Sequence, residues 1–280
     1  MRSRLLFTIA VVLAGTILFA PAAAGDGGPS PGVLQGGTGL VNGKVRYVTV
    51  PAGASTVLEV IRRRDGRVLS FMSLAGSWGI PAVAADGSAD GLMADGRTLV
   101  LGQLATGSYL RKQSMFALVD LKRMLVNKLI EVRGHHAFDA LSSNDRYLYL
   151  TQYVSTQDYT RYRVRAYDLR ADRLLPGAII DKREWEETMQ GYPVSRAKAR
   201  DGWVYTLYAG NREFFIHALD TTNVTAICID LPWRKQPKRL FDFRLRLGAE
   251  RQLLVRGPHG RALVTVDRES HRILNSVSNP

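Results

Sequence analysis

Cysteine is almost absent from this sequence, since Cys228 is the only one among 280 residues. One thiol cannot close an internal disulfide, and it cannot supply the set of cysteines that a structural zinc site or an iron–sulfur cluster needs. The chain also has no Gly-x-Ser-x-Gly elbow, no phosphate-binding glycine loop and no His-Glu-x-x-His pair, which are signatures of large enzyme classes. We therefore expect no cofactor, no metal and no catalytic residue that a motif identifies.

Helical periodicity is also scarce, and the one stretch that fits a helix is the short segment 181–189. The composition is that of an ordinary globular protein, with 46% apolar and 22% charged residues. Lys and Arg number 38 against 25 Asp and Glu, a net charge of +13. This excess bears on which partners the surface tolerates and not on the fold.

The first residues have the pattern of a secretory signal. Arg2 and Arg4 precede an uncharged apolar run over 5–20, which is followed by small residues over 21–25. We interpret 1–24 as a signal peptide, with an uncleaved membrane anchor as the alternative, and 25–38 as a Gly- and Pro-rich tether. The remaining 39–280 is expected to form one domain that is secreted or otherwise extracytoplasmic, without a stable membrane span after cleavage.

The domain contains an internal repeat of about fifty residues. A polar turn followed by an apolar, strand-like run begins at positions 42, 95, 144, 201 and 250. Asn-Gly, Asp-Gly and Asn-Asp pairs favour such turns because these residues tolerate positive φ. An independent marker, an apolar run that ends in aspartate, keeps the same period at Asp120, Asp168, Asp220 and Asp267. We expect these aspartates to cap turns.

Short strands in units that cannot bury their own faces favour an all-β fold, a β-propeller of about five four-stranded blades. The segments 80–84, 137–141 and 192–194 either complete one unit or open the next. The segment 33–40 is expected to pair with the last unit, so that the N- and C-terminal strands close the ring. A solenoid or two stacked sandwiches is the alternative, although both leave strand edges exposed.

The repeat unit resembles a known family. A polar turn with a Leu-Val-Leu strand at 95–101, followed by Ala-Leu-Val-Asp-Leu at 117–121, is similar to the extracytoplasmic YVTN and WD40-like β-propeller repeat proteins. The resemblance covers most of 40–280. It implies the fold, but it implies little about function, because propellers include binding proteins and unrelated enzymes.

In a propeller, loops that lead to the innermost strands converge at the mouth of the central channel, which is the default binding site. These segments supply the candidate ligand-binding residues Asp86, Asp90, His135, His136, Asp139, Tyr192, Arg196, Asp242 and Arg244. Carboxylates assembled there could act as acid and base or hold a cation. However, aspartate is common in turns for structural reasons. Adjacent histidines on a strand point to opposite faces, so we expect no metal at His135 and His136.

Basic side chains recur in the predicted turns, and we expect them to share one face with Arg196, Arg244 and Arg246. Such a face suits an anionic cell-surface polymer or a protein partner better than nucleic acid, which an exported protein rarely meets. We therefore expect a monomeric, non-catalytic binding or scaffold module. The alternative is a propeller enzyme that acts on a small carbohydrate or lactone at the channel mouth. The two hypotheses differ in whether the carboxylates converge on a common pocket.

Overall fold

A computed structural model of the protein describes residues 32–104, 111–155, 157–158, 160–181, 188–210, 214–233 and 239–277. These residues form five antiparallel β-sheets that follow one another along the chain, together with one short 3-10 helix, η1 (Leu240–Asp242). The expectation of an all-β fold is thus confirmed. The predicted signal peptide 1–24, the first half of the tether (25–31) and the core of the candidate helix at 181–189 lie outside the described residues.

Each sheet is built from strands that pair in chain order. Sheet 1 contains β2 (Leu40–Asn42), β3 (Val45–Ala52), β4 (Ser55–Arg62) and β5 (Val68–Ala75). Sheet 2 contains β6 (Trp78–Pro81), β7 (Thr98–Gln103), β8 (Gln113–Asp120) and β9 (Leu125–Arg133). Sheet 3 contains β10 (His136–Leu141), β11 (Tyr147–Tyr153), β12 (Arg161–Asp168) and β13 (Arg173–Leu174), and β14 (Met189–Gln190) also pairs with β12.

The last two sheets have the same order. Sheet 4 contains β15 (Tyr192–Lys198), β16 (Trp203–Ala209), β17 (Phe214–Asp220) and β18 (Thr225–Asp230). Sheet 5 contains β19 (Arg244–Leu247), β20 (Gln252–Arg256), β21 (Ala262–Asp267) and β22 (Ile273–Ser276). Every pairing within the five sheets is antiparallel, which allows short hairpin connections.

The repeat read from the sequence is confirmed, but its boundary falls one strand earlier than the polar turns suggest. Those turns connect the first strand of each sheet to the second, with Gly43 and Asp145 at φ 55° and Gly96 at φ 64°. The ambiguous segments 80–84, 137–141 and 192–194 therefore open the next unit, as parts of β6 with the residues after it, β10 and β15.

Aspartates at the ends of the third strands cap the following turns, as expected. Asp120 accepts the backbone N–H groups of Lys122 and Arg123 at 2.8 Å, and Asp168 accepts those of Arg170 and Ala171 at 2.9 Å. Asp220 and Asp267 make equivalent bonds to residues two or three positions ahead. A carboxylate that accepts two backbone donors satisfies groups that the turn would otherwise leave without partners.

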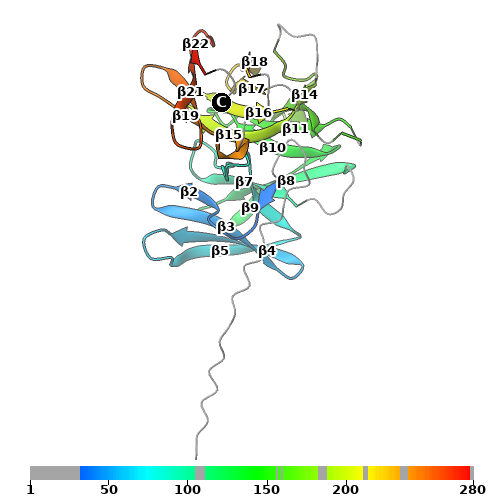
Figure 1. Cartoon of the computed structure of the whole chain (residues 1–280). Helices are drawn as coiled ribbons and strands as arrows, with labels where there is room; N and C mark the ends of the chain where they lie inside the picture. The colour runs from blue at the N-terminus through cyan, green and yellow to red at the C-terminus, as the bar shows by residue number, and fades with distance from the viewer. Residues whose placement is uncertain are drawn as a thin grey trace, which may run out of the picture.

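Four apolar cores hold the five sheets together, each between consecutive sheets. Trp78 and Leu58 pack between sheets 1 and 2, Phe138 between sheets 2 and 3, Tyr149 between sheets 3 and 4, and Leu245 between sheets 4 and 5. Within the described residues no such core joins sheet 5 to sheet 1. Figure 1 shows sheet 1 at the bottom of the molecule and sheet 5 at the upper left, with sheets 2 to 4 connecting them. The arrangement is propeller-like, without a detected closure.

The expected pairing of 33–40 with the last unit is wrong. Strand β1 (Val33–Leu34) pairs with β6, with Val33 opposite Pro81 and Leu34 opposite Ile80. Sheet 5 has its own fourth strand, β22, so it needs no strand from the N-terminal segment. The N-terminal segment instead meets two glycines of sheet 2, Gly79 and Gly102, whose missing side chains leave room for Val33.

Among the residues described above, no helix is long and apolar enough to cross a membrane.

Candidate functional site

First strands of neighbouring sheets contact one another in two places, and the segment after β6 packs against β15. Strand β15 packs against β19, and β6 packs against β10. The backbone N–H groups of Ala85 and Asp86 donate to the carbonyls of Pro193 and Val194 in β15, at 2.9 and 3.1 Å. The segment after β6 is thereby joined directly to sheet 4.

A buried ion pair crosses from sheet 3 to sheet 4. The guanidinium of Arg196 on β15 donates to the Asp139 carboxylate and carbonyl of β10, and its Nε donates to Thr206 Oγ1 at 3.0 Å. Both charged side chains are at least 94% buried, with 6% and 4% exposed. Burial alone would lower the pKa of Arg196, but the Asp139 carboxylate beside it raises the pKa above its usual value. Arg196 therefore stays protonated, and its bonds to Asp139 fix β10 against β15.

Two further predicted carboxylates also bond to β15. Asp86 Oδ2 accepts the hydroxyl of Ser195 at 2.6 Å, and that hydroxyl in turn accepts the N–H of Leu245 at 2.9 Å. Asp90 pairs with Lys198 at 3.3 Å. The sequence interpretation missed Ser195 and Lys198, because nothing in their local pattern distinguishes them from other polar strand residues.

The structure therefore brings Asp86, Asp90, Asp139 and Arg196 around one strand, but each carboxylate binds a separate partner. Asp139 and Arg196 were expected in loops at a channel mouth, but they lie inside strands β10 and β15. No two of these carboxylates bond to one another in the described chain. Each carboxylate is thus engaged by a partner within the described chain, and the contacts give no support to a shared acid and base.

The remaining candidates do not take part in these contacts within the described chain. Tyr192 begins β15 and is 38% exposed. His135 and His136 are at the start of β10, next to sheet 2, and both are buried. The described residues contain no group of three His, Cys, Asp or Glu side chains able to hold a metal ion.

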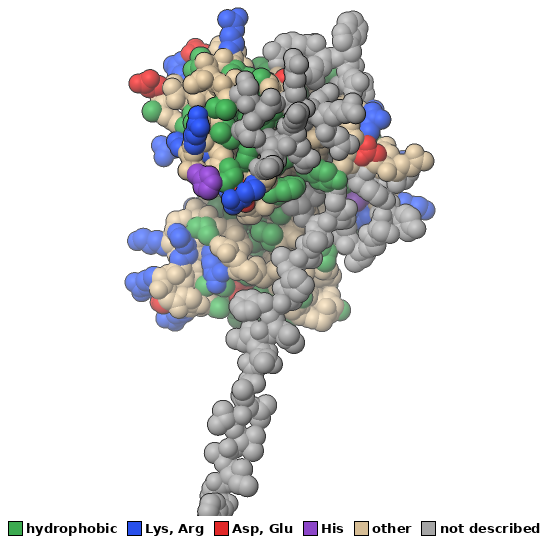
Figure 2. Space-filling view, viewed as in Figure 1, with side chains coloured by type: hydrophobic (Ala, Val, Ile, Leu, Met, Phe, Trp, Pro, Cys, Tyr) green, Lys and Arg blue, Asp and Glu red, His purple; other side chains and the backbone are tan. Residues whose placement is uncertain are grey.

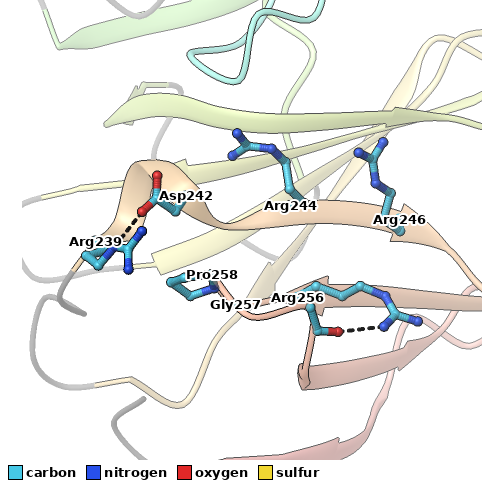
Figure 3. A pocket seen from close by; sticks show the side chains of 8 residues that line it. Arg239, Asp242, Arg244, Arg246, Arg256, Gly257 and Pro258 are labelled. Carbon is cyan, nitrogen blue, oxygen red and sulfur yellow. Dashed lines mark hydrogen bonds and ion pairs between the residues drawn. The ribbon is translucent and has the colours of Figure 1, made fainter.

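Asp242 and Arg244 belong to a separate groove of about 410 Å³ on sheet 5, which we call the basic groove. It is lined by Arg239, Asp242, Arg244, Arg246, Arg256, Gly257, Pro258 and Gly260. Figure 3 shows Arg244 and Arg246 projecting from β19, with Arg256 on the next strand and the Arg239–Asp242 pair at one end.

The four guanidiniums of the basic groove are poorly neutralised. Arg239 pairs with Asp242 at 2.6 Å, the single carboxylate of the lining. Arg244 donates to the carbonyls of Phe241 and Phe243, at 2.8 and 2.9 Å, and Arg256 donates to the carbonyl of Gly260. Carbonyls orient a guanidinium without cancelling its charge. The groove therefore carries four positive groups against one negative group.

Among the sheets that the structure describes, none covers the face of sheet 5 on which the groove lies. Leu245, Leu253 and Val255 point toward sheet 4 and are at most 1% exposed. Because side chains alternate along a strand, the residues adjacent to these three point to the opposite face. They include Arg244, Arg246, Leu254 and Arg256 on β19 and β20.

This placement corrects the expectation of one basic face. Arg268 lies beside the β19–β20 turn, where its N–H bonds to the Arg251 carbonyl. Arg244 and Arg256 are paired at the opposite end of the same sheet. Figure 2 accordingly shows lysine and arginine side chains on both the upper and the lower parts of the visible face. The basic turns and the basic groove are separate surfaces.

A second hollow, of about 380 Å³, lies at the turn end of sheet 5 and includes Trp203 and His271. Its charges are balanced within it, because Arg251 pairs with Glu269 and Arg268 pairs with Asp201. The ring of His271 packs against Trp203, with centroids 4.6 Å apart. The basic groove thus differs from this hollow in having unbalanced charge.

No known protein-family profile matches this sequence, and no curated protein sequence matches it. Solved structures that resemble it include dihydro-heme d1 dehydrogenase NirN in complex with DHE, with a TM-score of 0.48 and 14% identity over 89% of this chain and 48% of that one. TolB from Acinetobacter baumannii matches with a TM-score of 0.42 and 12% identity over 68% and 41% of the two chains. The Dos1 propeller matches with a TM-score of 0.49 and 10% identity over 86% of this chain and 58% of that one. This chain thus spans less than half the length of the NirN and TolB chains.

Proposed function

We propose that residues 39–280 form a five-bladed, propeller-like domain that acts outside the cytoplasm as a non-catalytic binding module. Its ligand is an anionic polymer, and the ligand binds in the basic groove. The observation that carries this proposal is the imbalance of four arginines against one aspartate on a face that no described sheet covers. Arginine suits carboxylate, sulfate and phosphate groups because its planar fork can donate two parallel hydrogen bonds.

The binding hypothesis is favoured over the enzyme hypothesis by the partners of the carboxylates. Asp86, Asp90 and Asp139 bond to Ser195, Lys198 and Arg196, so they are committed to holding sheets together. Asp242 lies in a different place, where it pairs with Arg239. An acid and a base for hydrolysis would have to be close to one substrate atom, and in the described chain each of these four groups is instead engaged by a separate partner.

The proposal predicts that Arg246→Gln weakens binding of heparin and of polyglutamate, which present sulfate and carboxylate groups respectively. Arg246 is exposed on β19, and its side chain has no hydrogen bond or ion pair to another described residue. Loss of one charge-assisted contact is expected to reduce affinity by roughly tenfold. Binding measured by calorimetry should also fall as salt rises, since salt screens exposed charges.

Arg97→Gln is the matched control, because it removes the same charge from an exposed turn of sheet 2 and should leave affinity nearly unchanged. Equal losses in both variants would show that only net charge matters. Binding that is insensitive to salt, or unaffected by Arg246→Gln, would contradict the proposal. Preference between the two polymers would identify the acidic group that the groove accepts.

A further inference from the structure

Strand β5 forms the outer edge of sheet 1, and among the described residues no strand pairs with its outer side. Its eight residues include no charged side chain and no proline. Three of its apolar side chains are exposed, Val68 by 42%, Leu69 by 48% and Phe71 by 68%. Such an edge presents backbone N–H and C=O groups that have no partner in the sheet, and another strand can pair with them.

The outer strands of the other four sheets each have a feature that protects a sheet edge. Strand β9 is nine residues long but contains Lys128 and Glu131, and β13 and β22 are only two and four residues long. Strand β18 is partly covered by Asp181, whose backbone bridges to Ala226 and whose carboxylate accepts the N–H of Cys228 at 2.8 Å. Charge, shortness and a covering segment all prevent edge-to-edge pairing. Within the described chain β5 has none of these protections.

The two faces of β5 differ in what they contact. Met72 and Leu74 pack into the apolar core between sheets 1 and 2. Phe71 lies between them and Leu69 along the strand, opposite Glu59 of β4, so it points to the face away from that core. Side chains directly across two paired strands lie about 5 Å apart. A strand added at this edge would therefore place its own side chains against Phe71.

The distribution of charge around β5 favours a second copy of this chain, in antiparallel orientation. The turn at 62–67, before β5, contains four arginines and one aspartate, whereas the segments 52–54 and 76–77 at the other end carry no charge. Antiparallel pairing of two β5 strands about a twofold axis places the arginine turn of each copy beside the uncharged end of the other. Parallel pairing would bring the two arginine turns together, where like charges repel. Because the chain carries a net charge of +13, two copies approach most easily at an uncharged edge.

We propose that two copies of this chain form a twofold dimer through antiparallel pairing of their β5 strands, which joins the two copies of sheet 1 into one continuous sheet. This replaces the monomer expected from the sequence. One strand pair is a small interface, below the roughly 1,200 Å² of a stable complex, so the dimer forms reversibly as concentration rises. Figure 1 shows β5 at the lower edge of the molecule and sheet 5 at the upper left, so dimerisation leaves both basic grooves open.

The test combines sedimentation equilibrium with amide hydrogen exchange of the full chain at pH 7. The average mass should rise from that of one chain toward that of two as concentration increases to about 1 mM. Exchange in peptides covering 68–75 should slow by roughly tenfold or more where the dimer predominates, because pairing protects the outward N–H groups. Exchange in peptides covering 125–133, in the outer strand of sheet 2, should not depend on concentration.

Three variants make the result specific. Phe71→Lys and Leu69→Lys each place a charge on the exposed side of β5, and each should raise the dissociation constant of the dimer by roughly tenfold or more, since edge lysines oppose strand pairing. Both side chains are exposed, so the fold should persist. Leu129→Lys is the matched control, because it replaces an apolar side chain that is 53% exposed on β9 with the same charge. It should leave the dissociation constant nearly unchanged.

A monomer at every concentration would overturn the proposal, and so would a dimer that persists in both Phe71→Lys and Leu69→Lys. A dimer without protection of 68–75 would place the interface elsewhere and would also overturn it. The same holds if the chain stays monomeric and binds phosphatidylcholine vesicles through Phe71, since the apolar edge would then meet a lipid surface. No acidic polymer is present in these measurements, so their failure would leave the proposed function of the basic groove intact.

Discussion

At the scale of single residues, the aspartates differ in how far along the chain their partners lie. Asp120 and Asp168 cap turns as predicted, since capping depends only on residues two or three positions ahead. The roles of Asp139 and Arg196 depend on each other across 57 positions of sequence. No local pattern could indicate that pairing, so both were predicted to face a ligand.

His217 provides a prediction at this scale. It is 2% exposed, and burial lowers its pKa to about 4, with Arg196 also lowering it and Asp139 and Asp181 opposing this. In the unfolded chain this histidine has the ordinary pKa of 6.5. As pH falls below 6.5, the unfolded state gains the proton first, so stability is lost between pH 6.5 and about 4. The shift corresponds to roughly 3 kcal/mol.

Urea unfolding at pH 7 and at pH 4.5 measures this loss. His217→Gln should reduce the difference in unfolding free energy between the two pH values, because its side chain does not titrate. His259→Gln, at an exposed turn, is the control and should retain the wild-type difference. An unchanged difference in His217→Gln would show that other groups dominate the acid response.

At the scale of elements, strand positions followed from the alternation of apolar residues, but strand partners did not. Segment 33–40 was expected to pair with the last unit, and instead β1 pairs with β6. This pairing depends on the close approach of β1 to Gly79 in β6. A Cβ placed on Gly79 would lie 2.6 Å from Cβ of Val33 and 2.8 Å from the Leu34 carbonyl. Only glycine at that position lets β1 reach the sheet.

Gly79→Ala should therefore displace β1 while leaving the other sheets intact. Overpacking of this kind costs about 1–3 kcal/mol, so amide hydrogen exchange in peptides covering 32–40 should accelerate by roughly tenfold or more. Gly248→Ala in sheet 5 is the control, because its new Cβ would meet only the side chains of Leu254 and Gln252. Unchanged protection of 32–40 in Gly79→Ala would contradict the contact.

At the scale of the whole molecule, five sheets are joined by four apolar cores, and the two outer faces remain uncovered. Closing the ring against sheet 5 would bury Arg244, Arg246 and Arg256, and burying unpaired charge is costly. On sheet 1, Phe71 is 68% exposed. The composition of the last sheet thus explains why no closure is present in the described chain, and the same arginines form the basic groove.

Ser195 tests how the sheets are held together. Its hydroxyl is fully buried and connects Asp86 of the segment after β6 with Leu245 of sheet 5. Ser195→Ala leaves a buried N–H and a carboxylate without this partner, which should lower the free energy of unfolding by about 1–3 kcal/mol. Chemical denaturation at pH 7 measures the change.

Ser270→Ala is the control, because it removes an exposed hydrogen bond from the Ser270 hydroxyl to Asp267. It should lower the free energy of unfolding by less than half as much as Ser195→Ala. Equal effects of the two substitutions would show that the link through Ser195 contributes no more than a surface turn.

The sequence by itself determined the strands, the turns between them, the period of about fifty residues and the aspartates that cap turns in sheets 2 to 5. These features arise from backbone preferences and from side-chain alternation, which act over a few residues. Alternation shows which residues share a face, but it does not show what covers that face. The tertiary structure alone decided that Asp139 meets Arg196, that β1 joins sheet 2, and that the arginines of sheet 5 stay exposed. Each of these outcomes depends on contacts between sheets, where burial and charge are settled by residues far apart in the chain.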